Sequence, residues 1–318
     1  MHKLEKYCSF TIIFLLVLTL VGCNLAPGAP ASSQPLSPAT SSQAAPAAGM
    51  PTESTTITSG QKLKISFIDV GQADSTLIQI PNGKNVLIDA GNNDDSDKIV
   101  AYMKGQGINK LDIVIGTHPH EDHIGALDTV IKTFTIGQII LPPKDSTTNT
   151  YRDVIEAIAG KGQKITKAQG GLNLDLGSDV SAQLLAPNSN DYEDMNNYSA
   201  VVKITYGKNS FLFAGDAQEL SELEMVEAGY DLKADVLKVG HHGSHTSCST
   251  VFLAKVQPKY AVISVGKENS YGHPSQETLD KLCQYGAKVY RTDLAGTIIA
   301  ESDGKNINIY TVPSKTQP

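Results

Sequence analysis

Thr117-His118-Pro119-His120-Glu121-Asp122-His123 is the stretch that decides the fold of this chain, because it gathers three imidazoles and two carboxylates within six positions. Packing does not require such a group, whereas neutral imidazole and carboxylate are ligands that suit zinc and similar divalent ions. Two later clusters, His241-His242-Gly243-Ser244-His245 and Tyr271-Gly272-His273-Pro274, hold four more histidines. Seven of the eight histidines thus lie in three short clusters, which predicts one metal site.

The first cluster follows an apolar strand predicted at 111–116 and precedes a helix predicted at 124–134. Ligand-binding residues of open α/β sheets commonly lie on such strand-to-helix loops. A second apolar strand, predicted at 236–239, delivers the pair His241-His242 in the same way.

The rest of the globular part alternates between short strand patterns and amphipathic helix patterns. Strands are expected at 63–69, 75–80, 85–89, 138–141, 181–186, 200–206, 210–214 and 260–265, with closing hairpin strands within 288–309. Helices are expected at 97–105, 151–160, 219–228 and 275–285. Strand runs on both sides of interleaved helices predict an α/β domain over residues 62–318, built as a four-layer αββα sandwich.

The N-terminal 61 residues are expected to be a targeting segment and a linker rather than part of the domain. Residues 1–22 combine Lys3, Lys6 and a short apolar run, which is typical of a signal peptide. The sequence Leu20-Val21-Gly22-Cys23 resembles a bacterial lipobox, so we expect Cys23 to be lipidated and to anchor the protein to the outer side of the membrane. The alternative is an ordinary secretory peptide. Residues 24–61 are rich in Pro, Ala, Ser and Thr and read as a disordered tether.

Composition restricts the choice of partners. The formal net charge is -7, tryptophan is absent and there is no basic run, which counts against a surface that holds long nucleic acid. Outside the first 23 residues the cysteines are Cys248 and Cys283, whose spacing does not fit a metal site. We expect two buried thiols, with a disulfide as the alternative in an exported protein. No protein partner is indicated.

The spacing of the first cluster suits two ions rather than one. His118 and His120 lie two positions apart on an extended loop, so both rings can face one ion. Asp122 and His123 fall on the next turn and can face a second ion. Asp216 follows a strand and can supply a bridging oxygen, as in hydrolases whose two metals lie about 3.5–4 Å apart.

These residues resemble the metallo-β-lactamase fold superfamily, and more closely the soluble hydrolase domain of ComEC competence proteins and its free-standing relatives. The motifs that carry the resemblance are Phe67-Ile68-Asp69-Val70-Gly71-Gln72-Ala73-Asp74-Ser75, Leu87-Ile88-Asp89-Ala90-Gly91, Phe213-Ala214-Gly215-Asp216, His241-His242-Gly243-Ser244, Asn269-x-Tyr271-Gly272-His273-Pro274 and Arg291-Thr292-Asp293-x-x-Gly296.

The resemblance implies roles for the remaining histidines. His273 takes the last ligand position beside Asp122, His123 and Asp216. Asp122 also has a catalytic role, and His241 and His242 contact substrate oxygens or protonate the leaving group. A metal role for one member of that pair is the alternative. His245 is expected to support the site from outside or to be solvated.

The chain departs from the superfamily pattern in one ligand. The superfamily places a histidine between the first cluster and Asp216, whereas this chain has Asn196-Asn197 in that region. An amide oxygen is a weaker zinc ligand, so two zinc ions are the main expectation and manganese is the alternative. Asp89, Asp69 and Asp74 are expected to position the histidine loop by hydrogen bonds, with direct metal contact as the alternative.

The expected reaction is hydrolysis by a metal-activated water. Di-iron relatives of the superfamily carry an acid at the position of His120, so imidazole there favours hydrolysis over redox chemistry. The branch resemblance implies a phosphodiester substrate and a nuclease acting on DNA. One alternative is a cell-wall phosphodiesterase similar to phosphorylcholine esterases. Another is a surface binding protein that keeps the fold without turnover, while β-lactam hydrolysis is disfavoured by the branch.

Overall fold

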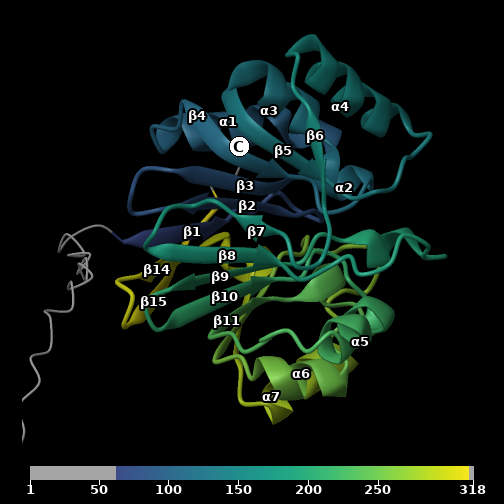
Figure 1. Cartoon of the computed structure of the whole chain (residues 1–318). Coiled ribbons are helices and arrows are strands. Elements are labelled where there is room, and N and C mark those ends of the chain that lie inside the picture. The colour runs from purple at the N-terminus through teal and green to yellow at the C-terminus, as the bar shows by residue number, and fades with distance from the viewer. Residues whose placement is uncertain (1–61, 315–318) are drawn as a thin grey trace, which may run out of the picture. The chain divides into compact units, whose positions relative to one another are not determined.

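Two β-sheets face each other in the computed structural model of this protein, which describes residues 62–314 (Figure 1). The predicted signal peptide, the lipidated Cys23 and the linker lie outside the described residues and stay predictions. No helix among residues 62–314 has the length and apolar character needed to cross a membrane.

The first sheet has eight strands in the order β15-β14-β1-β2-β3-β4-β5-β6. Its strands are β1 (Leu63–Phe67), β2 (Ser75–Gln79), β3 (Asn85–Ala90), β4 (Lys110–Ile115), β5 (Thr135–Leu141), β6 (Ile165–Lys167), β14 (Thr297–Ser302) and β15 (Ile307–Val312). The pairs from β15 to β3 are antiparallel, and those from β3 to β6 are parallel.

The second sheet has seven strands in the order β13-β12-β11-β10-β9-β8-β7. They are β7 (Asn173–Leu174), β8 (Val180–Leu184), β9 (Val202–Tyr206), β10 (Asn209–Phe213), β11 (Val236–Lys238), β12 (Tyr260–Ile263) and β13 (Lys288–Arg291). Here the pairing changes from antiparallel to parallel at β10, as it does at β3 in the first sheet. The two sheets therefore repeat one plan.

Helices cover the outer face of each sheet, as Figure 1 shows. The first sheet carries α1 (Ser96–Gly105), α2 (Glu121–Ile124), α3 (Leu127–Thr133) and α4 (Asn149–Gly160). The second carries α5 (Glu219–Glu227), α6 (Thr250–Val256) and α7 (Gln276–Gln284). The remaining short elements are α8 (Thr292–Ala295) and the 3-10 turns η1 (Asn93–Asp95), η2 (Met195–Tyr198) and η3 (Gly240–Gly243). The predicted four-layer αββα sandwich is confirmed.

Strand alternation divides the apolar side chains between three cores. Along β3, Val86 and Ile88 point into the core between the sheets, while Leu87 points to the helices. Phe67 and Phe213 meet across the inner core with ring centroids 6.1 Å apart. Because each sheet is buried on both faces, its central strands read as almost continuous apolar runs.

Two local predictions are wrong, one on a helix and one on the burial of a cysteine. The helix expected at 124–134 is broken after Ile124, because the N–H group of Ala126 bonds to the carbonyl of Ala90 and that of Gly125 is shared between the carbonyls of Glu121 and Gly91. Cys283 is exposed because it lies on the solvent side of α7, and both it and the buried Cys248 are free thiols.

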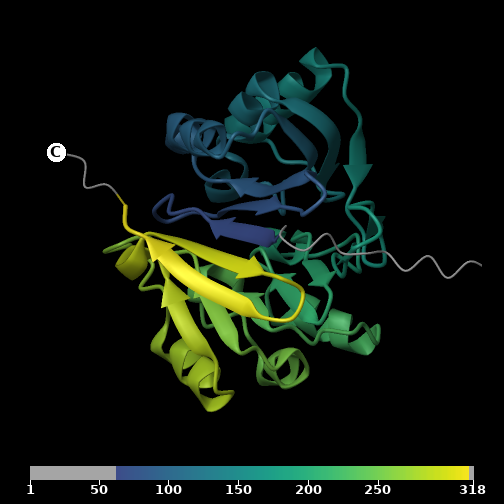
Figure 2. The ribbon, with the colours of Figure 1, turned by 90° about the vertical axis from the view of Figure 1, so that its left-hand side faces the viewer.

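The closing hairpin begins later than expected. Residues 288–291 form β13, which pairs in parallel with β12 in the second sheet, and only β14 and β15 form the hairpin. Figure 2 shows this yellow hairpin beside the purple β1, with which β14 pairs. The Thr292 hydroxyl, bonded to the backbone of Val265, fixes the chain where it leaves the second sheet.

Gly125→Ala should strongly destabilise the protein. A Cβ at this position would lie 2.2 Å from the backbone carbon of Asn92, which cannot move without opening the β3–η1 connection. We expect the free energy of unfolding to fall by about 3 kcal/mol in urea denaturation.

Gly160→Ala is the matched control, because it is helical and a Cβ there would meet no atom within 4 Å. It should leave stability within about 1 kcal/mol of the parent or raise it. Equal effects of the two substitutions would contradict the packing described at Gly125.

Candidate metal centre

The candidate site lies where strands of both sheets end. In the first sheet, Asp89 is near the end of β3 and the histidine loop follows β4. In the second sheet, Asp216 follows β10 and His241 follows β11. In each sheet these neighbouring parallel strands begin where the pairing changes direction, which is the usual location of a ligand site in an α/β sheet.

Asp89 holds the first histidine loop in place. Its carboxylate accepts hydrogen bonds from the Thr117 N–H at 2.7 Å and the Thr117 hydroxyl at 2.8 Å, and it lies 2.8 Å from His123 Nδ1. Its backbone φ of 60° is unusual for a residue with a side chain and turns the carboxylate toward the loop. With Nδ1 of His123 directed at Asp89, Nε2 faces the site.

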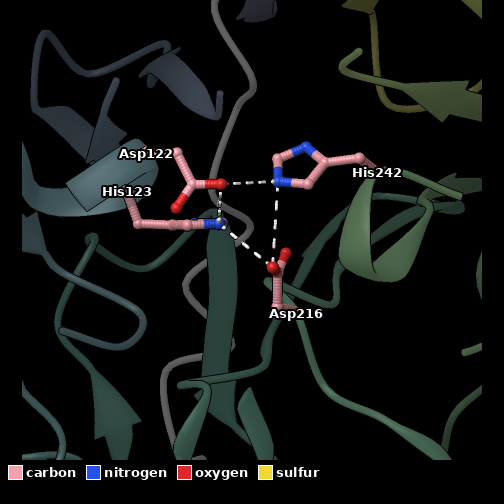
Figure 3. A group of neighbouring side chains, drawn as sticks. All are labelled: Asp122, His123, Asp216 and His242. Atoms are coloured by element: carbon pink, nitrogen blue, oxygen red, sulfur yellow. Dashed lines mark hydrogen bonds and ion pairs between the residues drawn. The ribbon is translucent and has the colours of Figure 1, made fainter. Parts of the chain in front are cut away.

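Four side chains converge on one point, as Figure 3 shows. One ligand atom from each of Asp122, His123, Asp216 and His242 lies within 4.8 Å of all the others. His242 Nε2 is 3.1 Å from an Asp122 oxygen, and His123 Nε2 is 3.3 Å from Asp216 Oδ2. Two carboxylates and two imidazoles at this separation form a donor set suited to a divalent ion.

Asp216 Oδ2 also faces a second set of donors. It lies 3.8 Å from His118 Nε2 and 3.8 Å from His241 Nε2. His120 completes this side, since its Nδ1 is 2.9 Å from His118 Nε2. Asp216 Oδ2 therefore faces four imidazole rings. Those of His123 and His242 belong to the first set, and those of His118 and His241 lie on the second side.

Several donor atoms are buried with no partner in hydrogen-bonding geometry among the described residues. Among them are His123 Nε2, Asp216 Oδ1 and Asn196 Oδ1, which lie at this site. Buried polar groups are normally satisfied, and those left over need an explanation such as an ion or water. The donor types, their convergence and these free atoms together fit divalent metal ions.

The charges at the site alter the acidity of its members. Burial opposes ionisation of Asp216, but His123 and His242 outweigh it and hold the pKa of Asp216 well below its usual range. Burial would also lower the pKa of His242, yet Asp216 and Asp74 raise it to about 10. The pKa of His123 is raised well above its usual value against burial, mainly by Asp216 and Asp89. Burial lowers the pKa of His118, with His123 adding to the effect.

Asp74 and Lys238 form a buried ion pair behind His242, with 2.7 Å between Lys238 Nζ and Asp74 Oδ2. The other Asp74 oxygen lies 3.4 Å from His242 Nδ1, and that nitrogen is 3.0 Å from the Ser264 carbonyl. Sequence reasoning missed this role of Lys238. The sequence feature that could have predicted this buried ion pair is a lysine within the otherwise apolar run Val236-Leu237-Lys238-Val239.

The structure brings His242, rather than His273, into the group with Asp122, His123 and Asp216. Both His241 and His242 have a backbone φ of 50°, and such left-handed non-glycine residues cluster at functional sites. His273 lies outside this group, with its ring centroid 5.7 Å from that of His241. The sequence-based expectation had the opposite arrangement for these two histidines.

The other expected residues are divided between the site and its surroundings. Asn196 faces His241, with 3.5 Å between Nδ2 and Nε2, whereas the Asn197 side chain accepts backbone N–H groups at the start of α5. His245 is exposed. Asp69 accepts hydrogen bonds from Gly71 and Ser314, and it belongs to neither carboxylate–imidazole group found within residues 62–314.

A pocket of about 340 Å³ opens over these donors. Its lining comes from both sheets and consists of Gln72, His120, Glu121, Asp122, Asn196, Asp216, His241, His242, Tyr271 and His273. Donors from both sets, among them His120, Asp122 and His242, are therefore accessible to a small group of a substrate.

Comparison with known families identifies the class of protein. A family model described as the metallo-beta-lactamase superfamily matches residues 68–267, and the chain belongs to this superfamily. Members of the superfamily are generally metal-dependent hydrolases.

The curated relatives are competence-type members, which confirms the branch resemblance. The chain is 32% identical over 252 residues to ComE operon protein 3 of Bacillus subtilis (strain 168), covering 74% of this chain and 32% of that protein. It is 30% identical over 260 residues to Recombination protein 2 of Haemophilus influenzae, covering 80% of this chain and 31% of that protein. The chain thus spans about a third of the length of these relatives.

Among solved structures, the chain is similar to CmlA, a diiron beta-hydroxylase from Streptomyces venezuelae. The TM-score is 0.51 at 12% identity, and the match covers 80% of this chain and 55% of CmlA. At this identity the likeness concerns the fold alone.

Metal binding should release protons and strengthen as pH rises. In the metal-free protein His123 and His242 are protonated at neutral pH, because their pKa values are raised, that of His242 to about 10. A ligating imidazole must be neutral, so binding at pH 7 should release about two protons per chain. Zinc titration calorimetry in buffers of different ionisation enthalpy measures this number. Affinity that is constant between pH 6 and pH 9, with no proton release, would contradict the assignment.

Proposed function

We propose that the protein is a metal-dependent phosphodiester hydrolase that acts on nucleic acid. The observation that carries the proposal is the position of Asp216 Oδ2, 3.3 to 3.8 Å from imidazole nitrogens on two sides. A shared carboxylate oxygen between two donor sets is the arrangement of two-metal hydrolases.

Each donor set would hold one divalent ion. His118 and His120 would hold the first, Asp122, His123 and His242 the second, and Asp216 would contact both. His241, whose Nε2 also faces Asp216, would remain free to contact the substrate. Ions bound there would supply a water acidic enough to lose its proton near neutral pH and would stabilise charge on the attacked group. Zinc suits the imidazoles, and Asn196 in place of a further imidazole makes manganese the alternative for the first position.

His241 is suited to contact the substrate. Its Nδ1 lies 3.0 Å from the Thr246 hydroxyl, which can donate to it and leave the proton of the neutral ring on Nε2. Burial lowers the pKa of His241, so the ring is neutral at pH 7. Its Nε2–H would then donate to a phosphoryl oxygen in the pocket and oppose the charge that develops there.

The curated relatives support a nucleic-acid substrate by their names, which refer to competence and recombination. The pocket favours a small phosphodiester as the second candidate, because its lining within the described residues contains no lysine or arginine. Lys203 and Lys238, two of the basic residues near the motifs, are instead paired with Asp231 and Asp74. A cell-wall phosphodiester would fit the same site.

Turnover of a panel of phosphodiesters by the metal-loaded protein tests the proposal. We expect hydrolysis of bis-p-nitrophenyl phosphate and of single- or double-stranded DNA. His241→Ala should retain bound metal and lose about 100-fold in kcat, because it removes a donor to the developing charge.

His245→Ala is the matched control, since this histidine belongs to the same loop but is exposed. It should leave both metal content and kcat unchanged. Activity on p-nitrophenyl phosphorylcholine with none on DNA would favour the cell-wall candidate. Full metal occupancy without turnover of any phosphodiester would overturn the proposal and indicate a binding protein.

A further inference from the structure

Tyr271 is an aromatic side chain that the fold leaves in solvent beside the pocket. Its exposed fraction is 70%, yet it lines the pocket that holds Asp216 and His241. The ring is therefore available to a molecule that enters the pocket.

The loop that carries Tyr271 is ordered by one side chain. Asn269 accepts hydrogen bonds from the N–H groups of Tyr271 at 3.2 Å and His273 at 3.0 Å. Its amide group donates to the carbonyls of Gly266 and His273 at 3.0 and 2.7 Å. Four bonds from Asn269 therefore fix the backbone of the turn that carries Tyr271.

The same loop is attached to the first sheet. Gln72, on the β1–β2 connection, accepts a hydrogen bond from the Gly266 N–H at 2.9 Å. The contact is so close that a Cβ on Gly266 would lie 2.7 Å from the Gln72 backbone nitrogen. Tyr271 thus sits on a rigid rim that both sheets support.

A row of rings leads from Tyr271 to the candidate metal centre. Tyr271 stacks on His273 with ring centroids 5.8 Å apart and planes 20° apart. His273 is followed by His241 at 5.7 Å, and His241 Nε2 is 3.8 Å from Asp216 Oδ2. A group bound at Asp216 therefore has the Tyr271 ring at the outer end of the same wall.

We propose that Tyr271 is a base-stacking platform, on which the nucleobase next to the scissile phosphodiester packs. The inference rests on the proposed phosphodiesterase function and assigns its substrate class as nucleotides. Stacking of bases on exposed aromatic rings is one of the contacts by which proteins hold single-stranded nucleic acid without reading its sequence. The pocket lining, in the described part of the chain, lacks lysine and arginine, so the Tyr271 ring is the stacking contact that it offers to a base.

A planar base suits this ring better than a quaternary ammonium group does. Recognition of choline-like cations relies on a cage of several aromatic rings. Tyr271 is the one tyrosine in the pocket lining, which has no phenylalanine among the described residues. A single open ring face favours a flat partner.

The test compares a dinucleoside monophosphate, thymidylyl-thymidine, with its counterpart that lacks both bases. Tyr271→Ala should lower kcat/KM for thymidylyl-thymidine about tenfold, through KM, because one stacking contact is lost. The base-free substrate should be cleaved by parent and variant at the same rate. Tyr271→Phe, which keeps the ring, should behave like the parent on both substrates.

Equal losses on both substrates would overturn the inference, as would a loss confined to p-nitrophenyl phosphorylcholine, which would identify a cation site. If the parent cleaves no phosphodiester, the proposed function fails separately. Binding of thymidylyl-thymidine to the metal-loaded protein, measured by calorimetry, then decides the role of Tyr271. Base-dependent binding that Tyr271→Ala removes would support the platform, and unchanged binding would contradict it.

Discussion

The carboxylate of Asp216 is buried between the two sheets, and the arrangement of the site follows from the need to compensate its charge. A buried carboxylate is costly unless positive charge or hydrogen bonds surround it. Here the surrounding imidazoles come from loops of both sheets. His118 and His123 follow β4 of the first sheet, and His241 and His242 follow β11 of the second. Because the surrounding carboxylates raise the pKa values of His123 and His242, the metal-free site holds protons in places that a divalent ion would take.

Buried acids outside the centre keep these histidines in place. Asp89 fixes the first loop through Thr117, and the Asp74–Lys238 pair lies behind His242. Glu222 serves the segment after His245, where its two oxygens accept the N–H groups of Cys248 and Ser249 at 2.6 and 2.7 Å. Because solvent does not reach the Glu222 side chain, burial raises its pKa to about 7. Hydrogen bonds of this kind fix the orientation of the side chains that would bind the metal.

The sequence was sufficient for the layers, the strand-end position of the histidine loop and the family, because apolar periodicity and motif spacing are local properties. It placed His273 beside Asp122, His123 and Asp216. The structure has His242 in that position, on a left-handed backbone that spacing does not reveal. The break after Ile124 was missed for a similar reason, as it arises from contact with Gly91 and Asn92, far away in sequence. The role of Lys238 was missed because its buried partner Asp74 lies far away along the chain.

Metal content of Asp216→Ala is the most direct test of this account. The parent and the exposed-site control Asp280→Ala should retain the same number of zinc or manganese ions after gel filtration, measured by plasma emission spectrometry. Asp216→Ala, with an unchanged circular dichroism spectrum, should retain less than about half of that number, because Asp216 faces both donor sets. Full metal content in the folded Asp216→Ala variant would contradict the claim that one shared carboxylate organises the site.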